Sequence, residues 1–278
     1  MKCAWPSFLR VIPQRMGEET DRLARNDLQE LRLRIGKPPQ LVTANGIQWL
    51  TGAVTEDELR YVINMASRYS PWSAQTIHNG YITAPGGHRI GICGEYSLSQ
   101  GEITGFRNPT SVCIRIARDL PGVARRIPSD IRSCLILGPP GSGKTTLMRD
   151  LIRRISAGGA CIAVVDERGE LFPPGGDFDT GPATDIYTGC SKSQGIMMAL
   201  KTMGAQWIAV DEITEEKDLE ALLGAWGCGV RLLASAHASS LEDLENRYVY
   251  RSIKEKKVFD TIVILQPDKS YRLERIPL

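Results

Sequence analysis

Apolar and polar positions divide the chain into two halves with different periodicities. In the second half, short apolar runs alternate with stretches of helical spacing, and the runs fall at residues 133–137, 160–166, 206–211, 230–236 and 259–265. Strands that alternate with helices are typical of a mostly parallel, doubly wound sheet. We therefore expect an α/β fold for this half.

Two segments of the first half predict helices. Apolar residues of segment 17–35 recur at roughly helical spacing and predict one amphipathic helix: Leu23, Leu28, Leu31 and Ile35. Thr55 and Glu58 stand three residues apart before an apolar-periodic segment. This spacing is that of a capping box and predicts the start of a second helix.

Glycine pairs in the first half predict strands that reverse direction. Asn45-Gly46 lies between two alternating segments, which is the strongest short signal for a hairpin. Two further strands are expected around Gly86-Gly87, and another at 111–118. Helices and strands mixed in this way predict a smaller α+β domain.

The stretch "DLPGVARRIPSDIR" at 119–132 is rich in Pro, Gly and Arg and predicts a connector between the halves. We place the boundary near residue 126. The expected domains are therefore an N-terminal α+β domain of residues 1–125 and an α/β domain of residues 126–278.

Composition narrows the class of protein. The 34 basic and 32 acidic residues give a net charge of +2, which provides no overall attraction to nucleic acid. The seven cysteines are odd in number and contain no CxxC pair, which favours a reducing cytoplasm. No apolar run approaches the roughly 20 residues that span a bilayer. We therefore expect a cytoplasmic chain that reaches a membrane only through a partner.

A glycine-rich segment follows the apolar run 133–137 and contains a complete P-loop pattern: Gly138, Pro139, Pro140, Gly141, Ser142, Gly143, Lys144, Thr145 and Thr146. Glycines let such a loop wrap around a phosphate, and amide N–H groups at the start of a helix favour its negative charge. Lys144 is expected to reach the β- and γ-phosphates, and Thr145 to offer its hydroxyl to Mg²⁺. The sequence thus predicts a site for ATP with Mg²⁺.

Two acidic residues, Asp211 and Glu212, stand at the end of the apolar run 206–211. Asp211 fits the position that ligates Mg²⁺ in P-loop enzymes, and Glu212 is placed to accept a proton from the attacking water. Acidic residues are also common at strand ends without such a role. The P-loop in the same predicted sheet favours the catalytic interpretation.

His237 follows the apolar run 230–236. In P-loop ATPases with an added strand, a later strand lies between the P-loop strand and the strand that bears the acidic pair. If 230–236 is that strand, His237 lies at the edge where open α/β sheets bind ligands. There an imidazole can contact the γ-phosphate or its water; the alternative is a histidine hydrogen-bonded to a loop carbonyl.

Four segments together resemble the secretion ATPase superfamily, the hexameric motors of type II and type IV secretion and of pili. They would be its P-loop, acidic box, Walker B region and histidine box: "GPPGSGKT", "VVDERGE", "AVDEI" and "ASAHASS". The resemblance makes Glu167 of the acidic box a further catalytic candidate. The chain is more similar to one branch, the stage III sporulation protein AA family, in segments such as "GGHRIGICG" and "ITGFRNPTSVCIRIAR".

The resemblance implies a RecA-like, additional-strand P-loop ATPase core. It also implies an ATPase of the mother cell that energises or assembles a channel complex to the forespore. A ring of subunits, by analogy a hexamer, and a small membrane-anchored partner are implied as well. One residue departs from the superfamily, because Asp211 stands where glycine is usual. Magnesium ligation by Asp211 therefore rests on the general P-loop argument.

Ring ATPases often complete their site with an arginine whose charge offsets that of the transferring phosphoryl group. In secretion ATPases such arginines come from the smaller domain, and the resemblance makes Arg89 and Arg107 the candidates. The alternative for both is an arginine that is solvated or ion-paired. Lys192, in the long segment 171–195, is a candidate for contact with a phosphate or a neighbouring subunit.

Two alternative functions share this core. A RecA-like, nucleic-acid-dependent ATPase is disfavoured by the small net charge and the lack of an aromatic-basic stripe, so no nucleic acid is expected. A nucleotide-binding assembly switch with little turnover is disfavoured by the intact set Lys144, Thr145, Asp211 and Glu212.

Overall fold

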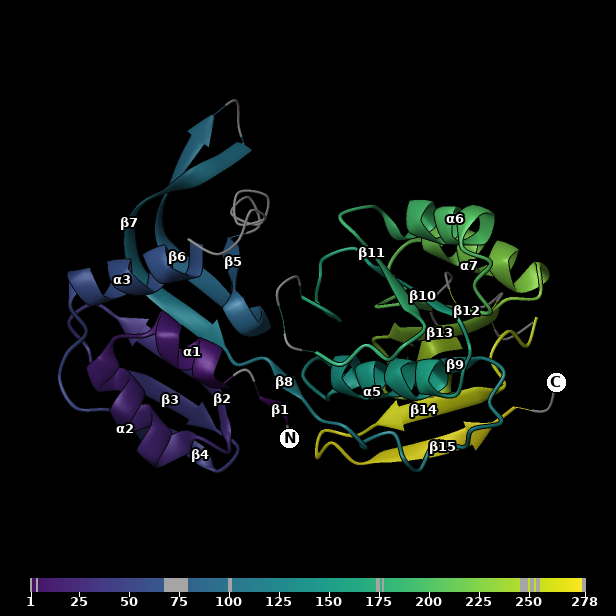
Figure 1. Cartoon of the computed structure of the whole chain (residues 1–278), viewed down its shortest axis with the longest axis horizontal. Coiled ribbons are helices and arrows are strands. Elements are labelled where there is room, and N and C mark those ends of the chain that lie inside the picture. Colours follow the sequence, from purple (N-terminus) through teal and green to yellow (C-terminus); the bar gives the residue numbers. More distant parts are fainter. Residues whose placement is uncertain are drawn as a thin grey trace. The chain divides into compact units, whose positions relative to one another are not determined.

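The computed structural model describes residues 2–3, 5–67, 80–99, 102–173, 176, 178–245, 250, 253 and 256–276 of the chain. The chain divides into two compact units (Figure 1). Unit 1 comprises Met1, Asp119–Phe172 and Phe178–Leu278, and unit 2 comprises Lys2–Arg118 and Pro173–Asp177. No helix in the described part of the chain is long and apolar enough to cross a membrane.

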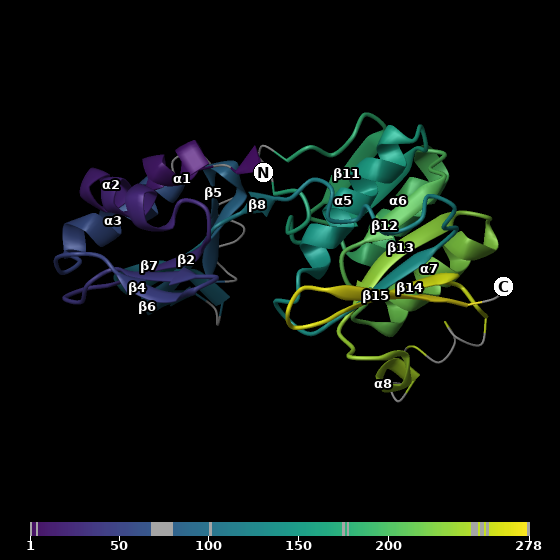
Figure 2. The ribbon, with the colours of Figure 1, turned by 90° about the horizontal axis from the view of Figure 1, so that it is seen from below.

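Unit 2 is built on a six-stranded antiparallel sheet in the order β4-β3-β2-β7-β6-β5. Its strands are β2 (Leu28–Arg34), β3 (Gln40–Thr43), β4 (Gly46–Trp49), β5 (Tyr81–Ala84), β6 (His88–Ser99) and β7 (Glu102–Arg115). Three helices lie on one face of this sheet (Figure 2): α1 (Trp5–Val11), α2 (Gln14–Ala24) and α3 (Glu56–Ser67). Alternate strand residues such as Leu31, Leu33 and Ile114 are buried against these helices, as expected from the period of two in a strand.

Two short strands complete the description of the first 119 residues. β1 (Lys2–Cys3) and β8 (Arg118–Asp119) pair as a separate two-stranded sheet. The 3₁₀ turn Pro85–Gly87 joins β5 to β6. In Figure 1, β6 and β7 continue past the other strands of the sheet as a two-stranded ribbon.

Local signals in the first half are confirmed where short-range chemistry decides them. β3 pairs antiparallel with β4, with Thr43 opposite Gly46, as the hairpin signal predicted. In the capping box, the Glu58 N–H donates to Thr55 Oγ1 over 3.2 Å and the Thr55 N–H donates to Glu58 Oε2 over 3.0 Å. β5 and β6 pair antiparallel around the predicted glycine turn.

The single helix predicted over residues 17–35 is wrong. α2 ends at Ala24, and residues 28–34 form β2, which pairs with β3 on one side and β7 on the other. Leu28 and Leu31 are buried as predicted, but on a sheet. Apolar residues three apart fit a helix locally, and pairing with strands far along the chain overrides that pattern.

Unit 1 is built on a seven-stranded sheet in the order β11-β10-β12-β13-β9-β14-β15. Its strands are β9 (Cys134–Leu137), β10 (Ile162–Asp166), β11 (Thr184–Thr188), β12 (Trp207–Val210), β13 (Arg231–Ala236), β14 (Thr261–Leu265) and β15 (Tyr271–Arg275). All pairs are parallel except β14 with β15. The five predicted strands and the position of β13 between β9 and β12 are therefore confirmed.

Helices cover both faces of this sheet, as a doubly wound fold requires. α5 (Lys144–Ala157) packs against one set of strand residues, among them Ile136 and Val164. α6 (Lys192–Thr202) and α7 (Glu216–Gly227) pack against the other set, among them Leu135 and Val165. A short helix, α8 (Leu241–Glu245), follows β13. The predicted α/β class is confirmed.

Two strands of unit 1 were not anticipated, and both lie at edges of the sheet. Neither β11 nor β15 has a buried residue, and both consist of half-buried and exposed positions. Neither therefore carries the continuous apolar run that marks the buried strands.

Candidate functional site

The phosphate half of the candidate site, defined as residues 138–146 with Asp211, Glu212 and His237, begins at the carboxyl end of β9. The loop 138–143 leads directly into α5, which starts at Lys144. Gly143 has a φ of 102°, a conformation that side chains other than glycine's rarely adopt. At Gly138, an added Cβ would lie 2.5 Å from Ser142 Oγ. The glycines of the motif are thus required by the backbone of this loop.

Ser142 and Lys144 show that this loop suits a phosphate. The Ser142 hydroxyl is buried and has no hydrogen-bond partner in the described part of the chain. An unpaired buried polar group costs on the order of 1–3 kcal/mol, which a phosphate oxygen could offset. The Lys144 side chain is only 8% exposed and donates to the carbonyls of Gly138 at 2.9 Å and Pro139 at 3.1 Å. Burial lowers the pKa of Lys144, against the opposing charges of Glu212 and Asp211.

A chain of three side chains joins the P-loop to the ends of two strands. Lys144 Nζ lies 2.8 Å from His237 Nδ1, and His237 Nε2 lies 3.2 Å from Glu212 Oε2. A protonated Lys144 can only donate, so Nδ1 accepts and Nε2–H donates to the Glu212 carboxylate. The P-loop lysine, the histidine after β13 and the acid after β12 therefore meet, although 93 residues separate the first two.

Asp211 lies in a strongly acidic environment. Burial, followed by the charges of Asp166, Glu170 and Glu212, raises the pKa of Asp211 to about 7, and the charge of Lys192 opposes this rise. Excess negative charge of this kind suits a cation.

The residues near Asp211 fit Mg²⁺ that arrives with a phosphate. In the part of the chain that is described, no group of three or more His, Cys, Asp or Glu side chains could hold a metal ion. Mg²⁺ in nucleotide sites usually takes one or two protein oxygens and completes its shell with phosphate and water. Thr145 and Asp211 would supply those protein oxygens. A bound Mg²⁺ would neutralise charge on the phosphates.

The carboxylates at the end of β10 have partners within the protein. Asp166 is fully buried and accepts the N–H groups of Glu170 and Phe172, each at 2.8 Å, so it shapes the turn after the strand. Glu167 accepts from Lys192 Nζ at 2.8 Å. Lys192, a candidate phosphate or subunit contact, thus forms an internal ion pair. Its ammonium also lies 3.4 Å from Thr214 Oγ1, just before α7.

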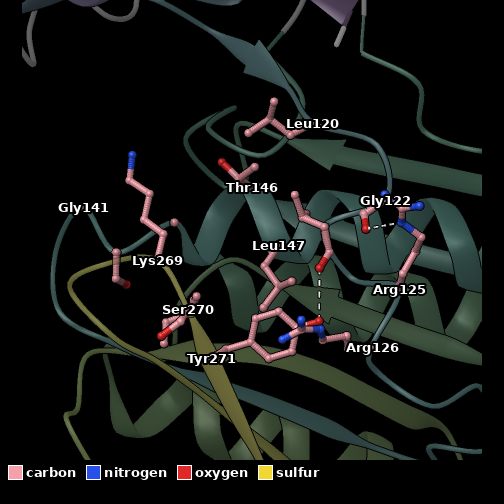
Figure 3. Close-up of a pocket in the computed structure, with 14 residues that line it drawn as sticks. Leu120, Gly122, Arg125, Arg126, Gly141, Thr146, Leu147, Lys269, Ser270 and Tyr271 are labelled. Carbon is pink, nitrogen blue, oxygen red and sulfur yellow. Dashed lines mark hydrogen bonds between the residues drawn. The ribbon is translucent and has the colours of Figure 1, made fainter. Parts of the chain in front are cut away.

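A cavity of about 570 Å³ lies beside the P-loop (Figure 3) and is here called the nucleoside half of the candidate site. Its walls come from three segments: residues 120–126, residues 141–147 and residues 265–271. The apolar surface of these walls comes from Leu120, Val123, Leu147, Leu265 and Tyr271. The walls also carry three cations, Arg125, Arg126 and Lys269. Thr146 of the P-loop segment also lines the cavity. Apolar walls with a few polar groups are typical of a small-molecule site.

The sequence did not reveal these walls. Residues 119–132 were interpreted only as a connector, and residues 265–271 include a turn after β14 with no motif. The available signal was the pairing of Val123 with two consecutive arginines, Arg125 and Arg126, in a connector. An apolar residue beside a few cationic side chains is a lining typical of a small-molecule site.

Arg89 and Arg107 belong to unit 2, whereas the residues above belong to unit 1. The Arg89 guanidinium lies over the Tyr81 ring at 3.7 Å from its centroid. Arg107 Nε donates to Ser97 Oγ at 3.1 Å on the ribbon of β6 and β7. A phosphoryl contact by either arginine stays a prediction.

Two solved structures have a similar fold. The ATPase DotB of Legionella pneumophila superposes with a TM-score of 0.63 at 16% identity, covering 94% of this chain and 79% of DotB. The pilus retraction motor PilT, solved with bound ADP, gives a TM-score of 0.63 at 14% identity, covering 96% of this chain and 84% of PilT. The chain therefore has the P-loop fold of the secretion ATPases.

Sequence comparison identifies relatives, one of them over almost the whole length. The Stage III sporulation protein AA of Bacillus subtilis (strain 168) is 32% identical over 278 residues, covering 93% of this chain and 90% of that protein. The uncharacterized protein ycf45 of Cyanidium caldarium is 29% identical over 182 residues, covering 61% of this chain and 54% of that protein. The family model described as "Sporulation stage III, protein AA" matches residues 9–273. The chain belongs to this sporulation stage III protein AA family.

Proposed function

We propose that the protein is an ATPase of the secretion-ATPase type, which hydrolyses ATP with Mg²⁺ to energise or assemble a channel complex between mother cell and forespore. The observation that carries the catalytic part is the chain Lys144–His237–Glu212, with distances of 2.8 and 3.2 Å. It joins a phosphate-binding lysine to a carboxylate that can act as a base.

Each residue of the phosphate half has a role in this proposal. The P-loop amides and Lys144 bind the β- and γ-phosphates. Glu212 accepts the proton of the attacking water once it is released from His237. His237, between the two, can hydrogen-bond the γ-phosphate or the water. Thr145 and Asp211 would hold Mg²⁺. Glu167, just after β10, would be a further catalytic residue.

The larger assembly follows by analogy. PilT, which shares the fold, was solved with ADP, and the family suggests a role in sporulation. A ring of subunits, by analogy a hexamer, would let Arg89 or Arg107 of one subunit complete the nucleotide site of its neighbour. A small membrane-anchored partner would hold the ring at the membrane.

The test is Mg²⁺-dependent ATP hydrolysis per molecule, measured as a function of protein concentration. A specific rate that rises with concentration supports sites completed between subunits, and an unchanged rate supports sites complete within one chain. Binding of ATP without hydrolysis, even with membrane fractions added, would favour the assembly switch. Stimulation by single-stranded DNA that disappears with salt would favour the nucleic-acid enzyme.

A further inference from the structure

One wall of the nucleoside half is an irregular segment with a few internal hydrogen bonds, from the Arg125 N–H and Arg125 Nε to the Gly122 carbonyl. Residues 122–126, here called the pocket turn, begin three residues after the end of β8 and line the cavity through Gly122, Val123, Arg125 and Arg126. The segment belongs to no helix or sheet. Contacts with neighbouring elements fix where this turn lies against α5 and β15.

The main contact is a carboxylate on the P-loop helix. Asp150 lies on α5, six residues after Lys144, and is 1% exposed. Its Oδ2 accepts the Ala124 N–H at 2.7 Å, and its Oδ1 accepts from Arg153 at 2.7 Å. Burial alone would raise the pKa of Asp150, but the N–H groups of Ala124 and Gly122 and the Arg153 guanidinium hold it below its usual value.

Other contacts fasten the same turn from both sides. Arg154 of α5 donates to the carbonyl oxygens of Ala124 and Ile127. The Tyr271 hydroxyl donates to the Val123 carbonyl at 3.1 Å across the cavity, as Figure 3 shows. Arg153 also pairs with buried Asp119 at 2.8 Å, at the end of β8. The turn is thus tied to the helix that carries the P-loop and to the strand that forms the opposite wall.

A buried carboxylate is an expensive way to stabilise a helix surface, because an apolar residue of similar size avoids its desolvation. Asp150 lines neither the cavity nor the P-loop. Within the described residues, its side chain hydrogen-bonds to the pocket turn and to Arg153, which also pairs with Asp119 at the end of β8.

We propose that Asp150 is a positioning residue for the nucleoside half: by holding the pocket turn against α5, it sets the affinity for the nucleoside and leaves the affinity for the phosphates unchanged. The inference rests on the proposed nucleotide-binding function and deepens it. The affinity for a ligand without a base and ribose, such as inorganic tripolyphosphate, should not change when Asp150 is replaced.

The test compares Mg²⁺-dependent binding of ADP and of tripolyphosphate by calorimetry, in the wild-type chain and in Asp150→Asn. We expect ADP affinity to fall about 10-fold, as for the loss of a buried charge-assisted hydrogen bond, and tripolyphosphate affinity to change less than about 2-fold. The ratio of the two affinities is a readout that a general loss of stability would not alter.

Asp260→Asn provides the matched control. Asp260 is also a buried carboxylate that accepts two backbone N–H groups, those of Arg132 and Ser133, and pairs with an arginine, Arg275. It lies just before β14, outside the nucleotide cavity. This variant should lose stability without a change in the ratio of ADP to tripolyphosphate affinity.

Tyr271→Phe keeps the experiment decisive if Asp150→Asn does not fold. It removes one hydroxyl and one hydrogen bond to the pocket turn, and should weaken ADP about 3-fold with tripolyphosphate unchanged. Equal weakening of both ligands in Asp150→Asn, or no change in either in a folded variant, overturns the inference alone. A wild-type chain that binds neither ligand overturns the proposed function together with it.

Discussion

The two halves of the candidate site are built in different ways. The phosphate half consists of strand ends and a helix start, where Leu137, Val210 and Ala236 end buried parallel strands. The nucleoside half consists of the pocket turn and the segment 265–271, which are fastened by a few side chains such as Asp150 and Tyr271. The first is fixed by the whole sheet, and the second by individual hydrogen bonds.

This difference predicts that single substitutions separate the two halves. In the phosphate half, the backbone stays in place when a side chain is removed, so the lost chemistry is that of the side chain itself. In the nucleoside half, loss of a side chain outside the cavity, such as Asp150, releases the segment that forms one of its walls. Variants in the phosphate half should therefore affect turnover or phosphate binding, and never the nucleoside alone.

The largest effect is expected from Glu212→Gln. The amide keeps the shape of the side chain but cannot accept the proton of the attacking water, so ATP turnover should fall about 1000-fold. Binding of ADP and of tripolyphosphate should stay within a factor of about three, since neither half loses a wall. Single-turnover hydrolysis and calorimetry measure the two quantities. Equal turnover in Glu212→Gln and wild type would remove Glu212 from the role of base.

Lys144→Ala should have the next largest effect and should act on binding. The variant removes the buried ammonium that hydrogen-bonds the P-loop carbonyls and would reach the phosphates. Affinity for ADP and for tripolyphosphate should both fall, each about 100-fold, because a charge-assisted contact to phosphate is lost. Parallel loss of both ligands is the opposite of the pattern expected for Asp150→Asn. A loss confined to ADP would contradict the division of the site into two halves.

How much of each half the sequence could predict follows from the same difference. The phosphate half was predictable because its residues end apolar runs, as His237 does after 230–236 and Asp211 does within 206–211. Strand ends of a parallel sheet meet at one edge, so a one-dimensional pattern places them together in space. The P-loop adds a spacing that few other structures require.

The rest depends on contacts between distant segments that leave no periodic signal. Asp150 reads as an ordinary polar position on an amphipathic helix, and its hydrogen bond to Ala124 spans 26 residues. Residues 28–34 became β2 for the same reason, since the partner β7 lies some 80 residues further on. The sequence shows which residues are apolar, but the partner segment decides which structure buries them.

The pH dependence of stability should have opposite signs in the two halves. Asp211 has its pKa raised to about 7, so between roughly pH 4 and 7 the folded chain retains a proton that the unfolded chain has lost, and stability falls as pH rises. Asp150 has its pKa lowered, so its contribution is present above the ordinary carboxyl pKa and is lost as pH falls through the folded-state value.

Urea denaturation in EDTA at several pH values measures both signs. The free energy of unfolding of Asp211→Asn, taken relative to that of wild type, should rise by about 2 kcal/mol from pH 5 to pH 8. The reason is that the substitution removes a carboxylate that the fold disfavours in its charged form. Asp150→Asn should be destabilised at pH 8, and this difference should shrink toward pH 3. If the free energies of unfolding of Asp211→Asn and wild type change equally across this range, the acidic residues around Asp211 do not destabilise the folded chain.

The smallest effect is expected from His237→Ala, because His237 contacts both catalytic partners without being the base or the main phosphate ligand. Its ring accepts from Lys144 and donates to Glu212, and those partners must exchange it for phosphate and water when ATP binds. Loss of one such contact in the transition state should slow turnover about 10-fold, while ADP and tripolyphosphate bind as in wild type or slightly more tightly, since Lys144 no longer has to leave the histidine. An unchanged turnover rate would mean that His237 only holds Lys144 and Glu212 in place while the site is empty. In that case slightly tighter binding of ADP and tripolyphosphate should be the only change in His237→Ala. The turnover and binding measurements together decide whether the histidine acts on the reaction or only on the enzyme before ATP binds.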